Sequence, residues 1–163
     1  MKIGILSDTH DNLEAITRAV KELNARQVDF VIHAGDYCAP FSLKPFSELA
    51  SDWLGVLGNN DGEAKGLTAV SGGRIKEGNA VLEYGGKRIL VDHVNPLRNA
   101  LAKSGQFDLI VFGHTHNLEI YREEECLCVN PGEVCGYLTG RHTVVCLDLD
   151  GLAPDKVDVI SLT

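Results

Sequence analysis

Five strand-like runs in the sequence are each followed, at their carboxyl ends, by polar side chains. The runs cover residues 2–6, 28–32, 53–57, 87–91 and 109–112. Apolar residues at 13, 16, 20 and 23 follow the first run, a spacing that predicts one face of a helix. In α/β sheets with such strand–loop–helix units, ligands bind at the carboxyl ends of the strands. We therefore expect the polar side chains to gather at one edge of a sheet.

The polar side chains at these strand ends are of the types that bind divalent metal ions. They are Asp8, His10, Asp36, Asn59, His93, His114 and His116. Carboxylate and imidazole together favour Mn, Fe, Co, Ni or Zn, whereas Ca and Mg prefer oxygen ligands almost throughout. Two such ions about 3.5–4 Å apart can hold a hydroxide between them and neutralise phosphoryl oxygens during in-line attack. The sequence therefore predicts a pair of metal ions bridged by one aspartate.

The segment Gly113 to His116 also has an ordinary structural interpretation. Gly113 lets the chain turn sharply as its strand ends, and an extended backbone through Thr115 would aim His114 and His116 into one pocket. An isolated His-x-His is equally consistent with an exposed polar turn, because imidazoles are common on surfaces. The upstream motifs favour the metal site.

Three further segments bear on that site. Residues 59–62, Asn-Asn-Asp-Gly, taken alone are typical of a turn. His33 falls within a strand end, so we predict a buried, hydrogen-bonded residue rather than a ligand. Residues 130–133, Asn-Pro-Gly-Glu, follow a strand-like run and could come back beside the site.

Composition limits the classes of protein and partner. The 163 residues fit a single domain, and the apolar runs are far shorter than the roughly 20 residues of a membrane span. A formal charge of −8 disfavours extended nucleic-acid or anionic-lipid binding, although a small anionic ester remains possible if metal ions supply the positive charge. Five cysteines without a Cys-x-x-Cys argue against a disulfide framework and a zinc knuckle. We expect a cytoplasmic protein with mostly buried cysteines and no membrane partner, and leave a homo-oligomer open.

Several other elements are expected from local signals. Pro45 is predicted to begin a short helix that runs to Ala50. A hairpin is predicted to turn on residues 85–86, Gly-Gly. Asn95 and Pro96 predict the start of a helix with residues 97, 100 and 101 facing inward. Residues 118–162 predict mainly strands, with the three glutamates 123–125 at a solvated hairpin tip.

The order of these motifs resembles that of the calcineurin-like metallophosphoesterase superfamily, and in particular its small single-domain bacterial and archaeal phosphodiesterase branch. The matching blocks are Asp8-x-His10, Gly35-Asp36, Gly58-Asn59-x-Asp61, the lone His93 and Gly113-His114-x-His116. The resemblance implies an α/β fold, a four-layer α/β/β/α sandwich of two mixed β-sheets flanked by helices. It also implies one metal held by Asp8, His10, Asp36 and His116, and a second held by Asp36, Asn59, His93 and His114.

The sequence departs from the family pattern at two positions. Many phosphatases of the superfamily carry a histidine where Asn60 stands, and that histidine contacts phosphate or protonates the leaving group. Asn cannot be a general acid, which favours esters with acidic leaving groups and leaves Asp61 without its obvious task of orienting that histidine. Val94 stands where the family usually has glycine after the lone histidine. The backbone at His93 could therefore follow a different path from that of the family.

The resemblance implies a dinuclear metal-dependent phosphodiesterase that acts on small or exposed phosphodiesters, with Mn as the first choice of ion. Attack by a metal-bridging hydroxide would involve Asp36, Asn59 and Asn60 as candidate catalytic residues. The alternative is a binding module, because a retromer coat subunit resembles this branch and serves as a scaffold. This chain keeps every ligand-type residue, which favours catalysis. A metallo-β-lactamase-type hydrolase is disfavoured, because its His-x-His-x-Asp-His string does not occur.

Overall fold

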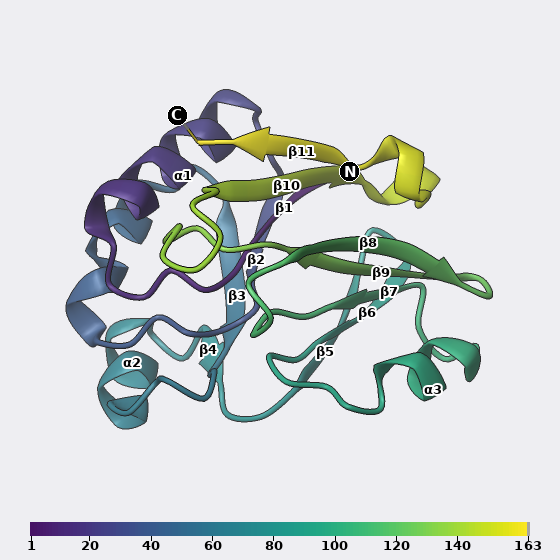
Figure 1. Cartoon of the computed structure of the whole chain (residues 1–163), viewed down its shortest axis with the longest axis horizontal. Coiled ribbons are helices and arrows are strands. Elements are labelled where there is room, and N and C mark those ends of the chain that lie inside the picture. The colour runs from purple at the N-terminus through teal and green to yellow at the C-terminus, as the bar shows by residue number, and fades with distance from the viewer. Residues whose placement is uncertain (163) are drawn as a thin grey trace.

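The computed structural model describes residues 1–162, and these residues form two β-sheets that face each other, with helices on the outer faces (Figure 1). The six-stranded sheet has the order β11-β10-β1-β2-β3-β4, and the five-stranded sheet the order β5-β6-β7-β9-β8. Both sheets contain parallel and antiparallel pairs. The predicted four-layer α/β/β/α architecture is confirmed.

The six-stranded sheet carries the N-terminal ligand loops. Its parallel strands are β1 (Lys2–Leu6), β2 (Phe30–His33), β3 (Asp52–Val56) and the short β4 (Ile75–Lys76). Beyond β1 the sheet continues with β10 (Thr143–Asp148), which is antiparallel to β1, and β11 (Asp158–Ser161), which is antiparallel to β10. Because β1, β2 and β3 run in the same direction, their carboxyl ends deliver three loops to one edge.

The five-stranded sheet begins with the predicted hairpin. Strands β5 (Ala80–Tyr84) and β6 (Lys87–Val91) are joined by two glycines with φ of 57° and 71°, the backbone that a tight hairpin requires. Strand β7 (Leu109–Val111) is parallel to β6 and to β9 (Cys126–Pro131), and β8 (Leu118–Glu123) is antiparallel to β9. The three glutamates lie where β8 turns into β9, as predicted.

Three helical segments cover the outer face of the first sheet: α1 (Leu13–Ala25), the 3₁₀ segment η1 (Pro40–Glu48) and α2 (Ala64–Val70). The short α3 (Arg98–Lys103) packs on the second sheet, and the 3₁₀ turns η2 (Leu149–Gly151) and η3 (Pro154–Lys156) precede β11. The Asn12 side chain caps α1 by accepting a hydrogen bond from the N–H of Ala15 at 3.2 Å. No helix among residues 1–162 is long and apolar enough to cross a membrane.

The core between the sheets is built from alternate residues of both. Ile3, Ile5 and Ile32 of the first sheet pack with Ile89 and Val111 of the second, all fully buried. Each such side chain contributes roughly 1.5–3 kcal/mol on burial. This packing holds the strand ends of both sheets beside each other.

Two local predictions were wrong. The helix near Pro45 begins at Pro40 instead, because Pro40 takes the first-turn position and Leu43 and Phe46 provide the buried face. Helix α3 starts at residue 98 and buries Ala102, while residues 97 and 100 are exposed. Leu101 is partly buried and packs on the cluster that contains Phe112, as predicted. The Arg98 guanidinium lies 4.4 Å from the centroid of the Phe112 ring, so a cation covers the sheet beside it in place of residues 97 and 100.

Candidate metal centre

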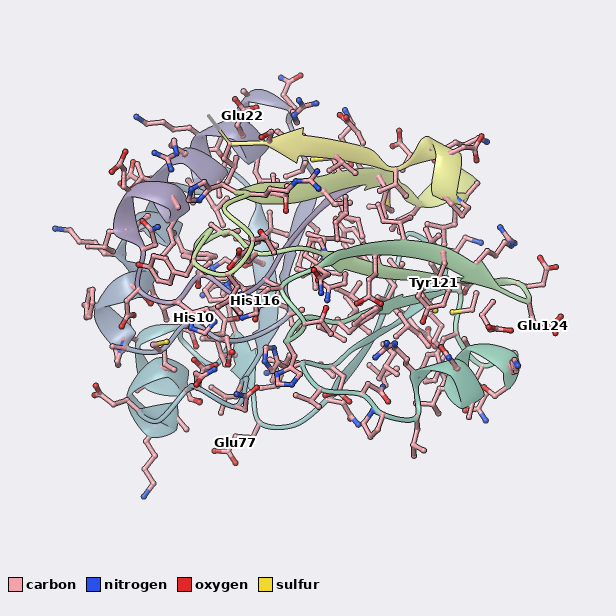
Figure 2. The ribbon with its side chains drawn as sticks, in the orientation of Figure 1. His10, Glu22, Glu77, His116, Tyr121 and Glu124 are labelled. Carbon is pink, nitrogen blue, oxygen red and sulfur yellow. The ribbon has the colours of Figure 1, made fainter. Side chains whose placement is uncertain are left out.

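All seven ligand-type side chains lie at one edge of the molecule, where β1, β2, β3, β6 and β7 end. His10 and His116 come from different sheets, yet their rings stack with centroids 5.0 Å apart (Figure 2). His93 and His114 form a second ring pair at 5.4 Å. The contacts of Asp36 and Asn59 connect the two pairs.

The carboxylate of Asp36 is central. Its Oδ2 lies 3.4 Å from His10 Nε2 and 3.2 Å from His93 Nε2. The backbone N–H of Asn60 donates to Oδ1 at 2.8 Å, and the Asn60 side-chain amide donates to Oδ2 at 2.7 Å. Burial alone would raise the pKa of this carboxyl, but the His93 ring and the Asn60 hydrogen bonds outweigh burial and lower it. Asp36 is therefore an ionised group placed between two imidazoles.

The first ring pair converges on Asp8. Asp8 Oδ1 lies 3.4 Å from His116 Nε2 and 3.8 Å from His10 Nε2. One ligand atom each from Asp8, His10, Asp36 and His116 all lie within 4.8 Å of one another. Within residues 1–162, the buried atoms Asp8 Oδ1 and His10 Nε2 have no hydrogen-bond partner. Buried polar atoms without partners are costly, so this donor set fits a divalent cation.

The second ring pair converges on Asn59. Its Oδ1 lies 3.0 Å from His93 Nε2 and 2.8 Å from His114 Nδ1. His93 Nδ1 donates to the carbonyl of Ala34 at 2.8 Å, which turns Nε2 toward Asn59 and Asp36. With Asp36 Oδ2 close to the same nitrogen, this group also has the oxygen and nitrogen donors of a divalent-ion site.

Backbone conformation at the ligands is unusual. Five ligand-type residues have φ in the left-handed region: Asp8 (53°), His10 (37°), Asp36 (62°), His114 (70°) and His116 (61°). Such values cost roughly 1–3 kcal/mol each in non-glycine residues and persist where the surroundings enforce them. The chain bends at both histidines, so the condition of an extended path through Thr115 is not met.

Gly113 lies where the chain turns, as predicted, since the N–H of Thr115 donates to the Gly113 carbonyl at 2.8 Å, and it has a second role as well. A Cβ at this position would overlap Ser7 Oγ and lie 2.8 Å from Asp8 Oδ2. The glycine thus allows β7 to approach the Asp8 loop, and the N–H of His114 donates to Asp8 Oδ2 at 3.2 Å. Val94, the other unusual residue, is 46 % exposed while His93 is buried, so its side chain does not crowd the ring pair.

Glu133 orients one of the ligand-type histidines. Glu133 Oε2 accepts a hydrogen bond from His116 Nδ1 at 2.7 Å, which turns Nε2 toward Asp8. Burial opposes ionisation of Glu133, but hydrogen bonds from His116 and Thr139 prevail and lower its pKa to about 2. The sequence signal for Glu133 was the loop 130–133, which does return to the site.

Asp61 holds two ligand loops together, a task that the sequence did not reveal. Its Oδ1 accepts from the backbone N–H groups of Tyr37 and Cys38, both at 2.7 Å. Its Oδ2 accepts from Asp36 at 3.1 Å and Gly58 at 2.7 Å. Asp61 was expected to lose its obvious task of orienting a histidine, and the structure gives it this other one. The sequence signal for Asp61 was its place in the Gly58-Asn59-x-Asp61 block.

His33 is buried and hydrogen-bonded, as predicted. The N–H of Gly35 donates to His33 Nδ1 at 3.0 Å, so Nε2 carries the proton and donates to Thr9 Oγ1 at 3.2 Å. Thr9 Oγ1 donates in turn to the carbonyl of Asp36 at 3.3 Å. Full burial lowers the pKa of His33 well below its usual value. The neutral His33 ring therefore holds the Asp36 loop in place through Thr9.

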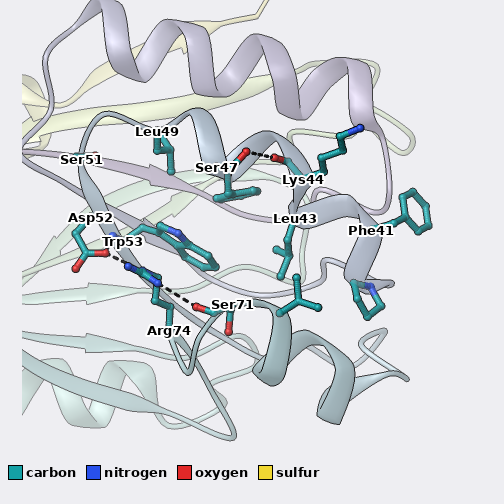
Figure 3. Close-up of a pocket in the computed structure, with 13 residues that line it drawn as sticks. Phe41, Leu43, Lys44, Ser47, Leu49, Ser51, Asp52, Trp53, Ser71 and Arg74 are labelled. Carbon is teal, nitrogen blue, oxygen red and sulfur yellow. Dashed lines mark hydrogen bonds and ion pairs between the residues drawn. The ribbon is translucent and has the colours of Figure 1, made fainter.

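A groove of about 660 Å³ lies away from this centre, between η1, β3 and the end of α2 (Figure 3). Its walls include Leu43, Phe46, Trp53 and Val70, and Arg74 at its edge is paired with Asp52. None of the seven ligand-type side chains lines it. Among residues 1–162, one buried polar atom without a partner, Ser51 Oγ, belongs to the lining of this groove, whereas Asp8 Oδ1 and His10 Nε2 lie at the metal centre, where the ligand-type side chains converge.

Comparison with known proteins agrees with the geometry. A model of the calcineurin-like phosphoesterase superfamily domain matches residues 1–152. The chain is 36% identical over 156 residues to the phosphodiesterase MJ0936 of Methanocaldococcus jannaschii, covering 92% of this chain and 94% of that protein. A solved archaeal phosphodiesterase shares 35% identity and superposes with a TM-score of 0.90, covering 99% of this chain and 100% of that one.

A more distant structure shares the fold alone. Vps29 of Chaetomium thermophilum is 17% identical, with a TM-score of 0.72 over 100% of this chain and 97% of that one. The motif order, the two facing sheets and the match over residues 1–152 lead to one conclusion. The chain belongs to the calcineurin-like phosphoesterase superfamily.

Proposed function

We propose that residues 1–163 form a single metallophosphoesterase domain that hydrolyses phosphodiester bonds with two divalent metal ions. The observation that carries this proposal is the position of Asp36, whose carboxylate lies between His10 of one ring pair and His93 of the other. One bridging carboxylate between two donor sets is the arrangement that two-metal hydrolysis requires.

The distances around Asp36 support two donor sets. Asp8, His10, Asp36 and His116 would hold one ion, and Asp36, Asn59, His93 and His114 the other. Mixed oxygen and nitrogen donors suit Mn first, with Ni, Fe, Co and Zn as alternatives. When bound, such ions would lower the pKa of a water molecule and neutralise phosphoryl oxygens.

The chain's own residues orient this chemistry. Glu133 and the Ala34 carbonyl fix the rings of His116 and His93, so that in each ring Nε2 faces the centre. The Asn60 amide, beside Asp36, can donate a hydrogen bond to a phosphoryl oxygen but no proton to a leaving group. The substrate is therefore a small phosphodiester whose leaving group is acidic enough to depart without a general acid.

The relatives support a diesterase over the alternative of a scaffold. The curated relative at 36% identity is a phosphodiesterase, whereas the Vps29 likeness extends to the fold alone. The alternative is a metal-binding scaffold, which would also place a cation at buried atoms such as Asp8 Oδ1 and His10 Nε2, so the preference for a diesterase rests on the relatives and on the complete set of ligand-type residues.

The direct test is hydrolysis of bis(p-nitrophenyl) phosphate by metal-stripped protein before and after addition of Mn. We expect activity to return with Mn and to be absent with chelator. Asp36→Asn, which removes the central charge, is expected to bind neither ion and to stay inactive. An Asp36→Asn variant that still contained two ions per chain would contradict the bridging assignment, and a fully active metal-free protein would contradict the function.

A further inference from the structure

A buried thiol lies beside the first ring pair. Cys135, in the loop between β9 and β10, is 1 % exposed, and its Sγ donates to Glu133 Oε2 at 3.1 Å. The same carboxylate oxygen accepts from His116 Nδ1 at 2.7 Å. The N–H of Cys135 donates to the carbonyl of Asp8 at 3.1 Å. The thiol is thus fixed to two residues of the metal centre.

The position of this thiol creates a second donor set. Cys135 Sγ, one ring nitrogen of His10 and one of His116 all lie within 4.8 Å of one another. The same two imidazoles belong to the oxygen-rich set with Asp8 and Asp36. Two sets of different chemistry therefore share both histidines.

The unpartnered atoms at this place point to a cation rather than to ordinary packing. Among residues 1–162, Asp8 is fully buried and its Oδ1 has no hydrogen-bond partner, although it faces both rings. Carboxylate oxygens suit a harder ion such as Mn, whereas two imidazoles and a thiolate are the donors that zinc and other thiophilic ions prefer.

We propose that His10, His116 and Cys135 form a binding site for a thiophilic divalent ion, in competition with the oxygen-rich set. The sulfur forms a bond to the ion, and the thiol proton, now donated to Glu133, is released to solvent. An ion on the thiol set uses both imidazoles that the other set requires, so the choice of set depends on which ion is present. This inference goes beyond the phosphodiesterase proposal and rests on side-chain positions alone.

Cys38 provides a matched control. Its Sγ lies 3.4 Å from His10 Nδ1 and it is half-buried, but it is not a member of the three-residue set. Both cysteines therefore contact the metal centre, and only Cys135 lies with both histidines. The remaining cysteines, Cys126, Cys128 and Cys146, are buried in the cores outside the centre.

The experiment is a titration of metal-stripped protein with cadmium alone, followed by the ultraviolet charge-transfer absorption of a cadmium–thiolate bond. We expect one such bond per chain in the parent protein and in Cys38→Ser. Cys135→Ser should lack the band and bind cadmium about tenfold more weakly or worse. Cys135→Ala, which fills less space but adds no polar group, serves as a second variant, and circular dichroism checks folding.

Competition supplies the second readout. Saturating Mn should reduce the cadmium–thiolate band, because the sets share His10 and His116. No band in the parent protein, a band retained in Cys135→Ser and Cys135→Ala, loss of the band in Cys38→Ser, or a band indifferent to Mn would each overturn the inference. Diester hydrolysis with Mn is measured separately, so a protein that hydrolyses the diester without a cadmium–thiolate band overturns this inference and leaves the proposed function intact.

Discussion

At the scale of single residues, His114 and His116 test whether the two donor sets are distinct. His116→Ala should lose the ion of the Asp8 and His10 set, and His114→Ala the ion of the Asn59 and His93 set. His114 is exposed, and His116 is buried against the carboxylates of Asp8 and Glu133, so neither truncation opens the apolar cavity that costs about 2–5 kcal/mol elsewhere. Metal content per chain, diester turnover and thermal melting of both variants test whether the two donor sets are distinct. Near-normal turnover at saturating Mn in either variant would favour a structural turn and the scaffold function.

Substitution of Glu133 measures how much the orientation of the His116 ring contributes to metal affinity. In Glu133→Gln, the amide no longer offers a charged acceptor to His116 Nδ1, so Mn affinity at the first set should fall about 10–100-fold. The matched control is Glu77→Gln, because Glu77 is exposed and forms no hydrogen bond or ion pair within residues 1–162. Isothermal titration with Mn measures the change, and equal affinities in the two variants would show that Glu133 does not orient His116.

At the scale of elements, Asp61 joins the loop after β2 to the loop after β3. Asp61→Asn replaces two acceptor sites with an N–H₂ group that cannot accept from the backbone, so stability should fall by about 2–4 kcal/mol. Urea unfolding of the metal-free protein measures this, with Asp155→Asn as the exposed control. If the variants unfolded at the same urea concentration, the four hydrogen bonds would not hold the loops together.

Most of the elements could be predicted from sequence, because periodicity and glycine turns are local signals. Strand β1 and helix α1 follow their apolar spacing, and the Gly85-Gly86 hairpin follows its turn chemistry. Helix α3 did not, since packing of Arg98 on Phe112 is a tertiary contact that no local pattern contains. Asp61 and the left-handed backbone at the ligands were missed for the same reason: both depend on loops that only the fold brings together.

At the scale of the whole molecule, the metal ions should tie the two sheets together. Asp36 and Asn59 follow strands of one sheet, and His93, His114 and His116 follow strands of the other. At 100 times its Kd, an ion that binds only the folded state adds about 2.7 kcal/mol of stability. Chelation should therefore lower the Tm by about 5–10 °C in a domain of this size. Melting curves with Mn and with chelator test this prediction. In Asp36→Asn, the Tm should be the same with Mn and with chelator. A Tm of the parent protein that did not depend on metal would contradict the prediction.

Substrate preference is also a property of the whole centre. Because Asn60 replaces a potential acid, kcat/KM for bis(p-nitrophenyl) phosphate should exceed that for unactivated alkyl monoesters. Rates with both substrates at the same Mn concentration provide the measurement. Equal or higher kcat/KM on alkyl monoesters would mean that another group protonates the leaving oxygen.

The left-handed backbone at five ligand-type residues has an evolutionary consequence. Each non-glycine residue held there costs roughly 1–3 kcal/mol, so natural selection for stability alone would replace it by glycine or asparagine. Aspartate and histidine remain at these positions only if selection for metal binding is stronger than selection for stability. Among relatives with this fold, lineages that abandoned catalysis should therefore accumulate glycine and asparagine at the positions of His114 and His116 first, and gain thermal stability as they do.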